Sequence, residues 1–142
     1  MSGTADIVRA LGGPRLVPAR SPGQLRALVR AGLPYASLAA VAAAFALPSL
    51  DAVSILRIPQ RTLARRKKEK RLSAEESDRL VRLARIAALA EEVLGSRDAA
   101  GRWLAAPNRA LGARTPLSEL DTDPGAEEVE SVLLRLAHGV VG

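Results

Sequence analysis

The chain has 142 residues, of which 48% are hydrophobic, so it can bury the core of one or two small domains. It has no cysteine and one histidine, which excludes a disulfide framework and a thiolate zinc site and gives no reason to expect a metal or another cofactor. The formal net charge is +6, and the three aromatic residues are too few for the stacking platforms on which single-stranded nucleic acids lie.

Richness in Ala, Leu and Arg favours helices over strands, so the predicted fold class is all-α. In chain order, residues 1–20 come first, and Gly12, Gly13, Pro14 and Pro18 predict a loose, flexible arm there. The arm lacks the continuous apolar core of a secretion signal. We therefore expect no export and a cytoplasmic location.

Two apolar helices are predicted next. The first has Ser21 as its N-cap and Pro22 at its first helical position, and it ends at Gly32. The uncharged stretch that follows could pass for a membrane span, but Pro34 and Pro48 confine its helix to about 12 residues, or roughly 18 Å, against a hydrocarbon core of ~30 Å. We expect a buried alanine-rich helix and no membrane partner.

A short helix over residues 49–56 and a basic helix from Gln60 to about Lys70 are separated by Pro59, which cannot continue the preceding helix. Residues 57–71 contain eight basic residues and one glutamate, a net charge of +7, so the rest of the chain sums to −1. The basicity of the chain is therefore concentrated in one patch.

The second half of the chain predicts a helical bundle. Ser73 and Glu76 form a capping box at the start of a long apolar helix that ends at Gly95. Further on, the sequence predicts a helix over residues 98–106, two single turns within 107–123, and an amphipathic helix that starts at Asp123-Pro124 and closes at Gly139.

A short helix, a turn marked by proline and a basic helix are the layout of a helix-turn-helix. In that geometry the first side chains of the second helix meet base edges, and later basic side chains neutralise phosphates. If about five basic side chains of the patch make such contacts, counterion release predicts a log–log salt slope of roughly −4 to −5. The candidates for base contacts are Gln60, Arg61 and Thr62, and the candidates for phosphate contacts are Arg65, Arg66, Lys67 and Lys68.

Catalysis is not indicated by the sequence. The carboxylates cluster at helix starts or on exposed faces, without a neighbour that would tune them for acid–base work. His138 lies in the last turn of the final helix, where a cap is a simpler role than a catalytic base. We therefore expect no enzyme.

From Arg61 onward the chain resembles the Xre/MbcA/ParS-like antitoxins that pair with RES-domain toxins. The likeness extends from about Gly32 to His138, and its most specific pieces are RTLARRKK with the nearby ESDRL. A second group of pieces lies in residues 103–117, where Trp103, Pro107, Asn108, Leu111 and Thr115 match the family motif. We expect these five residues to have structural roles first.

The resemblance implies a helix-turn-helix-like unit over residues 21–71 and a helical toxin-binding domain over 72–142. It implies an antitoxin that neutralises an NAD-degrading RES toxin by occluding its active site and that autorepresses the operon as a homodimer bound to operator DNA. The toxin-binding residues would be His138, Gly139, Val140, Val141 and Gly142.

Two positions depart from the family pattern, because Arg57 and Lys70 stand where the family usually has glycine before and after the basic helix. Either could alter the turn or lengthen the helix. Two other readings remain open at this point: a plain dimeric helix-turn-helix regulator without a toxin partner, and an antitoxin that has no DNA role.

Overall fold

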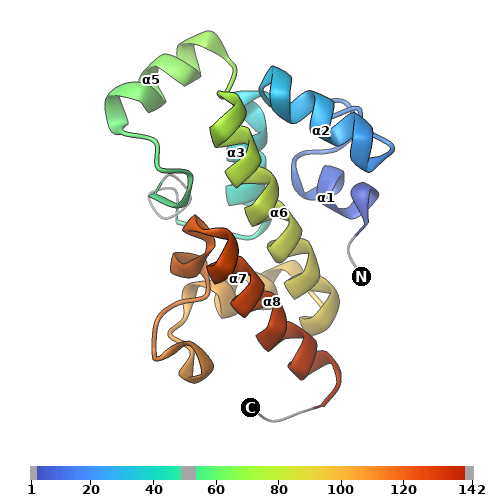
Figure 1. Cartoon of the computed structure of the whole chain (residues 1–142), viewed down its shortest axis with the longest axis vertical. Coiled ribbons are helices and arrows are strands. Elements are labelled where there is room, and N and C mark those ends of the chain that lie inside the picture. Colours follow the sequence, from blue (N-terminus) through green and yellow to red (C-terminus); the bar gives the residue numbers. More distant parts are fainter. Residues whose placement is uncertain (1–2, 49–53, 140–142) are drawn as a thin grey trace.

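The computed structural model describes residues 3–48 and 54–139, and this part of the chain is helical, with isolated β-bridges but no strand (Figure 1). In chain order the helices are α1 (Thr4–Ala10), α2 (Pro22–Ala31), α3 (Tyr35–Ala44), α5 (Gln60–Glu69), α6 (Ala74–Leu94), α7 (Arg97–Ala105) and α8 (Asp123–Ala137), with short 3-10 turns η1 (Arg109–Leu111) and η2 (Leu117–Asp121) before the last. The predicted all-α class is confirmed.

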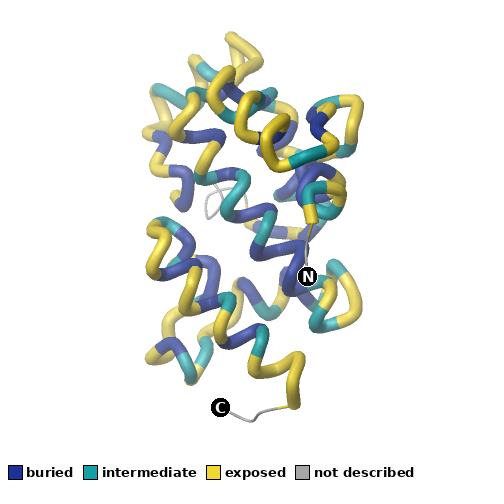
Figure 2. Tube along the Cα trace, turned by 45° about the vertical axis from the view of Figure 1, so that its right-hand side comes forward, coloured by how far each residue is buried: buried dark blue, intermediate teal, exposed yellow. Residues whose placement is uncertain are grey.

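Helix α6 is the centre of the molecule, and α1, α2, α7 and α8 pack against it. Its start is the predicted capping box: the Ser73 hydroxyl accepts from the Glu76 N–H, and the Glu76 carboxylate accepts from the Ser73 N–H. From Leu83 to Ala90 nearly every position is buried (Figure 2). The helix is apolar nearly all round because neighbouring helices cover it on several sides.

One hydrophobic core joins the basic N-terminal part to the C-terminal helices. Phe45, at the end of α3, is fully buried in this core, and Arg97 of α7 lies over its ring at 5.6 Å from the centroid. The backbones of α7 and α3 approach so closely at Gly101 that an added Cβ would lie 1.9 Å from the Phe45 carbonyl oxygen. The two parts of the chain are therefore packed together.

Residues 4–19 correct the prediction of a loose arm over residues 1–20. They form α1 and a turn, and the side chains of Ile7, Val8 and Leu11 are buried against the rest of the fold. Gly12 and Gly13, at φ of +107° and +98°, reverse the chain so that Val17 is buried as well. The glycines that suggested disorder instead make the turn that lets this segment pack.

Most predicted boundaries agree with the structure to within a residue or two. The final helix has Thr122 rather than Asp123 as its N-cap, and the Thr122 hydroxyl accepts from the Gly125 N–H. Of the short helix predicted over 49–56, residues 54–56 are helical and residues 49–53 lie outside the described part. No helix among the described residues is long and apolar enough to span a membrane.

Candidate functional site

The basic helix α5 projects at one end of the molecule (Figure 1). It begins after Pro59, and the buried side chain of Ile58 anchors the preceding turn. No residue of α5 is fully buried. Leu63, the one large apolar residue of α5, packs on the core. Few side chains therefore hold α5 against the rest of the fold, which leaves a long surface open to solvent.

Arg57 and Lys70, which stand where the family usually has glycine, both adopt a backbone conformation typical of glycine. Arg57 has φ of +57° and Lys70 has φ of +62°, in the left-handed region that L-residues rarely enter. Lys70 therefore ends α5 directly after Glu69, and the helix is not lengthened. The Arg57 side chain bonds to Asp121 of η2 at 3.3 Å, which fastens the turn before α5 to the C-terminal part of the chain.

The outward face of α5 carries a stripe of exposed positive charge. At 100° per residue, Arg61, Arg65 and Lys68 follow one another at i, i+4 and i+7 on the side opposite Leu63, and all three are exposed. Arg65 lies 3.7 Å from Glu69 in an exposed pair, which leaves its guanidinium accessible. Of the remaining predicted DNA contacts, Gln60 and Lys67 are exposed, and Thr62 is half-buried.

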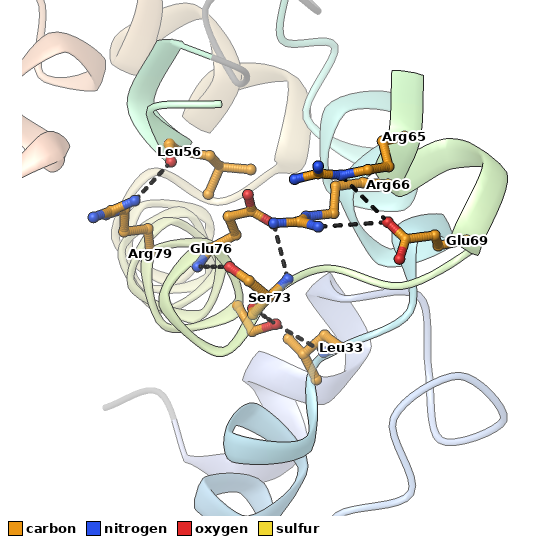
Figure 3. Close-up of polar contacts among 9 residues, drawn as sticks. Leu33, Leu56, Arg65, Arg66, Glu69, Ser73, Glu76 and Arg79 are labelled. Carbon is orange, nitrogen blue, oxygen red and sulfur yellow. Dashed lines mark hydrogen bonds and ion pairs between the residues drawn. The ribbon is translucent and has the colours of Figure 1, made fainter. Parts of the chain in front are cut away.

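Arg66 has a different position from its basic neighbours. Its side chain is only 19% exposed, and its Nε donates to the Glu76 carboxylate at 2.8 Å, with Glu69 at 3.5 Å on the other side (Figure 3). The same Glu76 oxygen accepts from the Ser73 N–H at 2.8 Å. Arg66 therefore ties the basic helix to the capping box of α6, an anchoring role that the sequence pattern did not predict.

The opposite charges of Arg66 and Glu76 stabilise the ionised form of each group. Burial alone would raise the pKa of Glu76, but the hydrogen bond from Arg66, the Ser73 N–H and the Arg66 charge outweigh it, so the pKa is lowered from the ordinary value of 4.5. The hydrogen bond with Glu76 likewise raises the pKa of Arg66. Both groups stay ionised over the physiological range.

The loop between α5 and α6 is fixed by further hydrogen bonds to the loop between α2 and α3. The Leu72 N–H donates to the Leu33 carbonyl at 2.9 Å, and the Leu33 N–H donates to the Ser77 hydroxyl at 2.7 Å. Arg71 donates to the Gly32 carbonyl at 2.7 Å. Arg71 thus belongs to the scaffold of the basic patch, and no periodicity in the sequence indicates that.

The family-motif residues of the C-terminal half build its turns. The Asn108 side chain accepts from the Ala110 N–H at 2.9 Å, and its backbone N–H donates to the Arg114 carbonyl at 3.0 Å, so Asn108 closes the η1 turn. Leu111 is buried beneath that turn, and Trp103 on α7 is half-buried. These positions support the predicted structural role.

Helix α8 ends at the opposite end of the molecule from α5 (Figure 1). His138 and Gly139 follow the helix and are exposed, and the His138 backbone N–H donates to the Leu134 carbonyl. Gly139 has φ of +71°, as a glycine stop requires. Val140, Val141 and Gly142, predicted to bind a toxin, lie outside the described residues.

The fold places exposed basic side chains of α5 together in one stripe. The end of α8 lies at the opposite end of the molecule from this stripe (Figure 1). A short helical segment, a tight turn and an exposed basic helix, built on a helical bundle, define a helix-turn-helix protein with a second helical module that shares its core. Two family models match in the same order: "Antitoxin Xre-like helix-turn-helix domain" over residues 24–85 and "Antitoxin Xre/MbcA/ParS C-terminal toxin-binding domain" over residues 89–139. The matched ranges meet within α6.

The chain belongs to the Xre/MbcA/ParS antitoxin family. It is 33% identical over 126 residues to a protein named Antitoxin Xre from Photorhabdus laumondii, and the match covers 87% of this chain and 85% of the relative. Proteins of the same name are 43% identical from Pseudomonas putida, over 58% of this chain, and 36% identical from Yersinia enterocolitica, over 66% of this chain. The matched parts span 52% and 65% of those two relatives, about half and nearly two thirds of their length.

Proposed function

We propose that this chain neutralises a RES-domain, NAD-degrading toxin and represses its own operon, as a cytoplasmic homodimer. The observation that carries the proposal is the separation of two surfaces on one fold. One is an exposed basic helix in the helix-turn-helix range, and the other is the exposed pair His138 and Gly139 after α8, at the end of the range described as toxin-binding. The proposed protein makes no use of a cofactor or of catalysis.

The DNA half of the proposal assigns roles along α5. Gln60, Arg61 and Thr62, in its first turn, face base edges in a major groove, and the later exposed cations neutralise phosphates. Arg66 is left out of the phosphate set because its guanidinium is engaged by Glu76. The phosphate-contacting residues are then Arg65, Lys67 and Lys68.

A gel-shift experiment at several salt concentrations tests this half on DNA from upstream of the chain's own gene. Replacing Arg65 or Lys68 by alanine should weaken binding, and each removal of a phosphate-neutralising cation should make the log–log salt slope shallower by about 1. Arg26→Ala is the matched control, because Arg26 is exposed on α2 and lies outside the basic patch. Equal slopes in all three variants would show that Arg65 and Lys68 do not contact phosphates, and absence of any shift by the original chain would leave an antitoxin without a DNA role.

The toxin half of the proposal assigns His138 and residues 139–142 to the cleft of the toxin. An apolar segment that follows a glycine stop can enter a narrow cleft of a partner protein. The partner to test is the protein encoded by the adjacent open reading frame.

Deleting residues 139–142 tests the occlusion. Cells that express the adjacent gene product should keep their NAD with the full chain and lose it with the truncated chain, because the tail no longer fills the cleft. The urea midpoint of the truncated chain should equal that of the full chain, since the deletion begins after α8 has ended. Unchanged protection by the truncated chain rejects occlusion by the tail.

A further inference from the structure

A shallow notch lies beside the end of α8, between that helix, α7 and the η1 turn. Its volume is about 110 Å³, and its apolar wall is formed by Trp103, Val132 and Leu136. Leu136 is 44% exposed and is the one large apolar side chain classed as exposed among residues 3–48 and 54–139. A single exposed leucine is ordinary, but here it borders a concave site that also has an indole in its wall.

Two arginines flank the apolar wall. Arg109 of η1 and Arg135 of α8 both line the notch and are exposed, and neither makes an ion pair within the part of the chain that the structure describes. The described lining contains no carboxylate. Trp and Arg are also the side chains that most often dominate the binding free energy of protein interfaces.

We infer that this notch is a second contact surface for the toxin, which receives an apolar side chain of the toxin flanked by carboxylates. The inference rests on the proposed function. Leu136 lies three residues before Gly139, about 4.5 Å along the helix axis, so a partner that takes in the tail meets the last turn of α8 at the rim of its cleft. The notch also falls within the range described as toxin-binding.

The charge of the notch disfavours a second copy of this chain as the occupant. A two-fold contact brings the same patch of both copies together, so Arg109 and Arg135 of one copy would face the same two residues of the other. Four guanidinium groups without a carboxylate between them repel one another. A partner with an acidic rim instead pairs with both arginines, and these pairs become stronger as water is excluded.

The notch and the tail have different tasks in this arrangement. The tail blocks the toxin's cleft, whereas the notch holds the toxin in place through contact area and charge. We therefore expect the chain that lacks residues 139–142 to bind the toxin measurably, although it no longer protects NAD.

The test measures the Kd between the purified chain and the purified product of the adjacent gene. Leu136→Glu should raise the Kd by about 10- to 100-fold, because it places a carboxylate on the apolar wall against the toxin's own acidic rim. The double variant Arg109→Glu/Arg135→Glu should raise it by about tenfold or more and should reduce its dependence on salt.

Ser118→Glu is the matched control for Leu136→Glu, because it adds the same charge to an exposed position of η2 that does not line the notch. Its Kd should stay within about twofold of that of the original chain, as is usual for a surface position outside an interface. Urea midpoints and the DNA shift should be the same for all variants, which excludes unfolding as the cause.

A Kd for Leu136→Glu equal to that of the original chain would overturn the inference. If the molar mass of this variant by light scattering is also lower, the notch is instead a contact between copies of the chain. Failure of the original chain to bind the adjacent gene product at all is a separate result, since it removes the proposed toxin partner itself.

Discussion

Glu76→Gln should destabilise the chain by about 2 kcal/mol at pH 7. The Glu76 carboxylate accepts two hydrogen bonds at 2.8 Å, from the Ser73 N–H and from the Arg66 guanidinium. Hydrogen bonds to ionised groups contribute about 1.5–3 kcal/mol each and are roughly twice as strong as neutral ones. The amide has nearly the same shape and keeps an acceptor oxygen, so it loses about half of the combined free energy.

The effect should depend on pH with a defined sign. The pKa of Glu76 is lowered in the folded chain, so the unfolded chain binds the proton more readily. The stabilisation is therefore complete above the ordinary pKa of 4.5 and is lost as the pH falls through the lower folded-state value. The difference between the original chain and Glu76→Gln should shrink in that acidic window, where both side chains are neutral.

The assay is urea unfolding followed by circular dichroism at pH 7 and at several lower values, because guanidinium salts would screen the ion pair. Glu75→Gln is the matched control: Glu75 occupies the same first turn of α6 but is exposed. It should cost only about 0.3–1 kcal/mol through the helix dipole. A Glu76→Gln cost that equals the Glu75→Gln cost, or that does not change with pH, would refute the assigned role of the Arg66–Glu76 pair.

Two further predictions concern backbone geometry, and urea midpoints check both. Gly101→Ala should lower the free energy of unfolding by about 3 kcal/mol or more, because the new methyl group would meet the Phe45 carbonyl oxygen at 1.9 Å. Gly23→Ala in α2 is the control: beyond the adjacent residues and the helix backbone, its methyl group would meet no atom nearer than 3.8 Å, so this change should be neutral or stabilising. Lys70→Gly should stabilise the chain by about 0.5–1 kcal/mol, because glycine occupies φ of +62° without the strain that lysine bears there. A Gly101→Ala midpoint like that of Gly23→Ala, or a lower midpoint for Lys70→Gly, would contradict these accounts.

The sequence predicted the helices whose signals are local. The Ser21 cap, the Ser73–Glu76 box and the glycine stop at Gly95 each specify a helix end within a few residues, and each lies where the structure has that end. The prediction of a loose arm was wrong for residues 4–19, because the same glycines fit a disordered arm and a tight turn. What distinguishes the arm from the turn is whether its apolar side chains are buried against residues far away in the sequence. The local sequence does not contain that information.

The candidate DNA surface was predictable in composition but not in detail. The density of basic residues identified α5, and helical spacing shows that Arg61, Arg65 and Lys68 share one face of it. That Arg66 turns inward depends on a glutamate ten residues later, in another helix, which no count of charges reveals. The notch beside Leu136 was likewise hidden, since it is formed by three elements that meet only in the folded chain.

The continuity of α6 has a mechanical consequence for the two surfaces. The same helix carries the Glu76 that anchors α5 near its start and also packs against α7 and α8. The close approach of Gly101 to Phe45 adds a second rigid link between the two parts. Because one packed core joins them, we expect a change at either end to reach the other as a shift of whole helices rather than as bending of a linker. If toxin and DNA binding are coupled in this chain, Gly101→Ala should therefore weaken the coupling, measured as the change in operator Kd on addition of the adjacent gene product. Equal coupling in both chains would assign it to contacts that bypass this core.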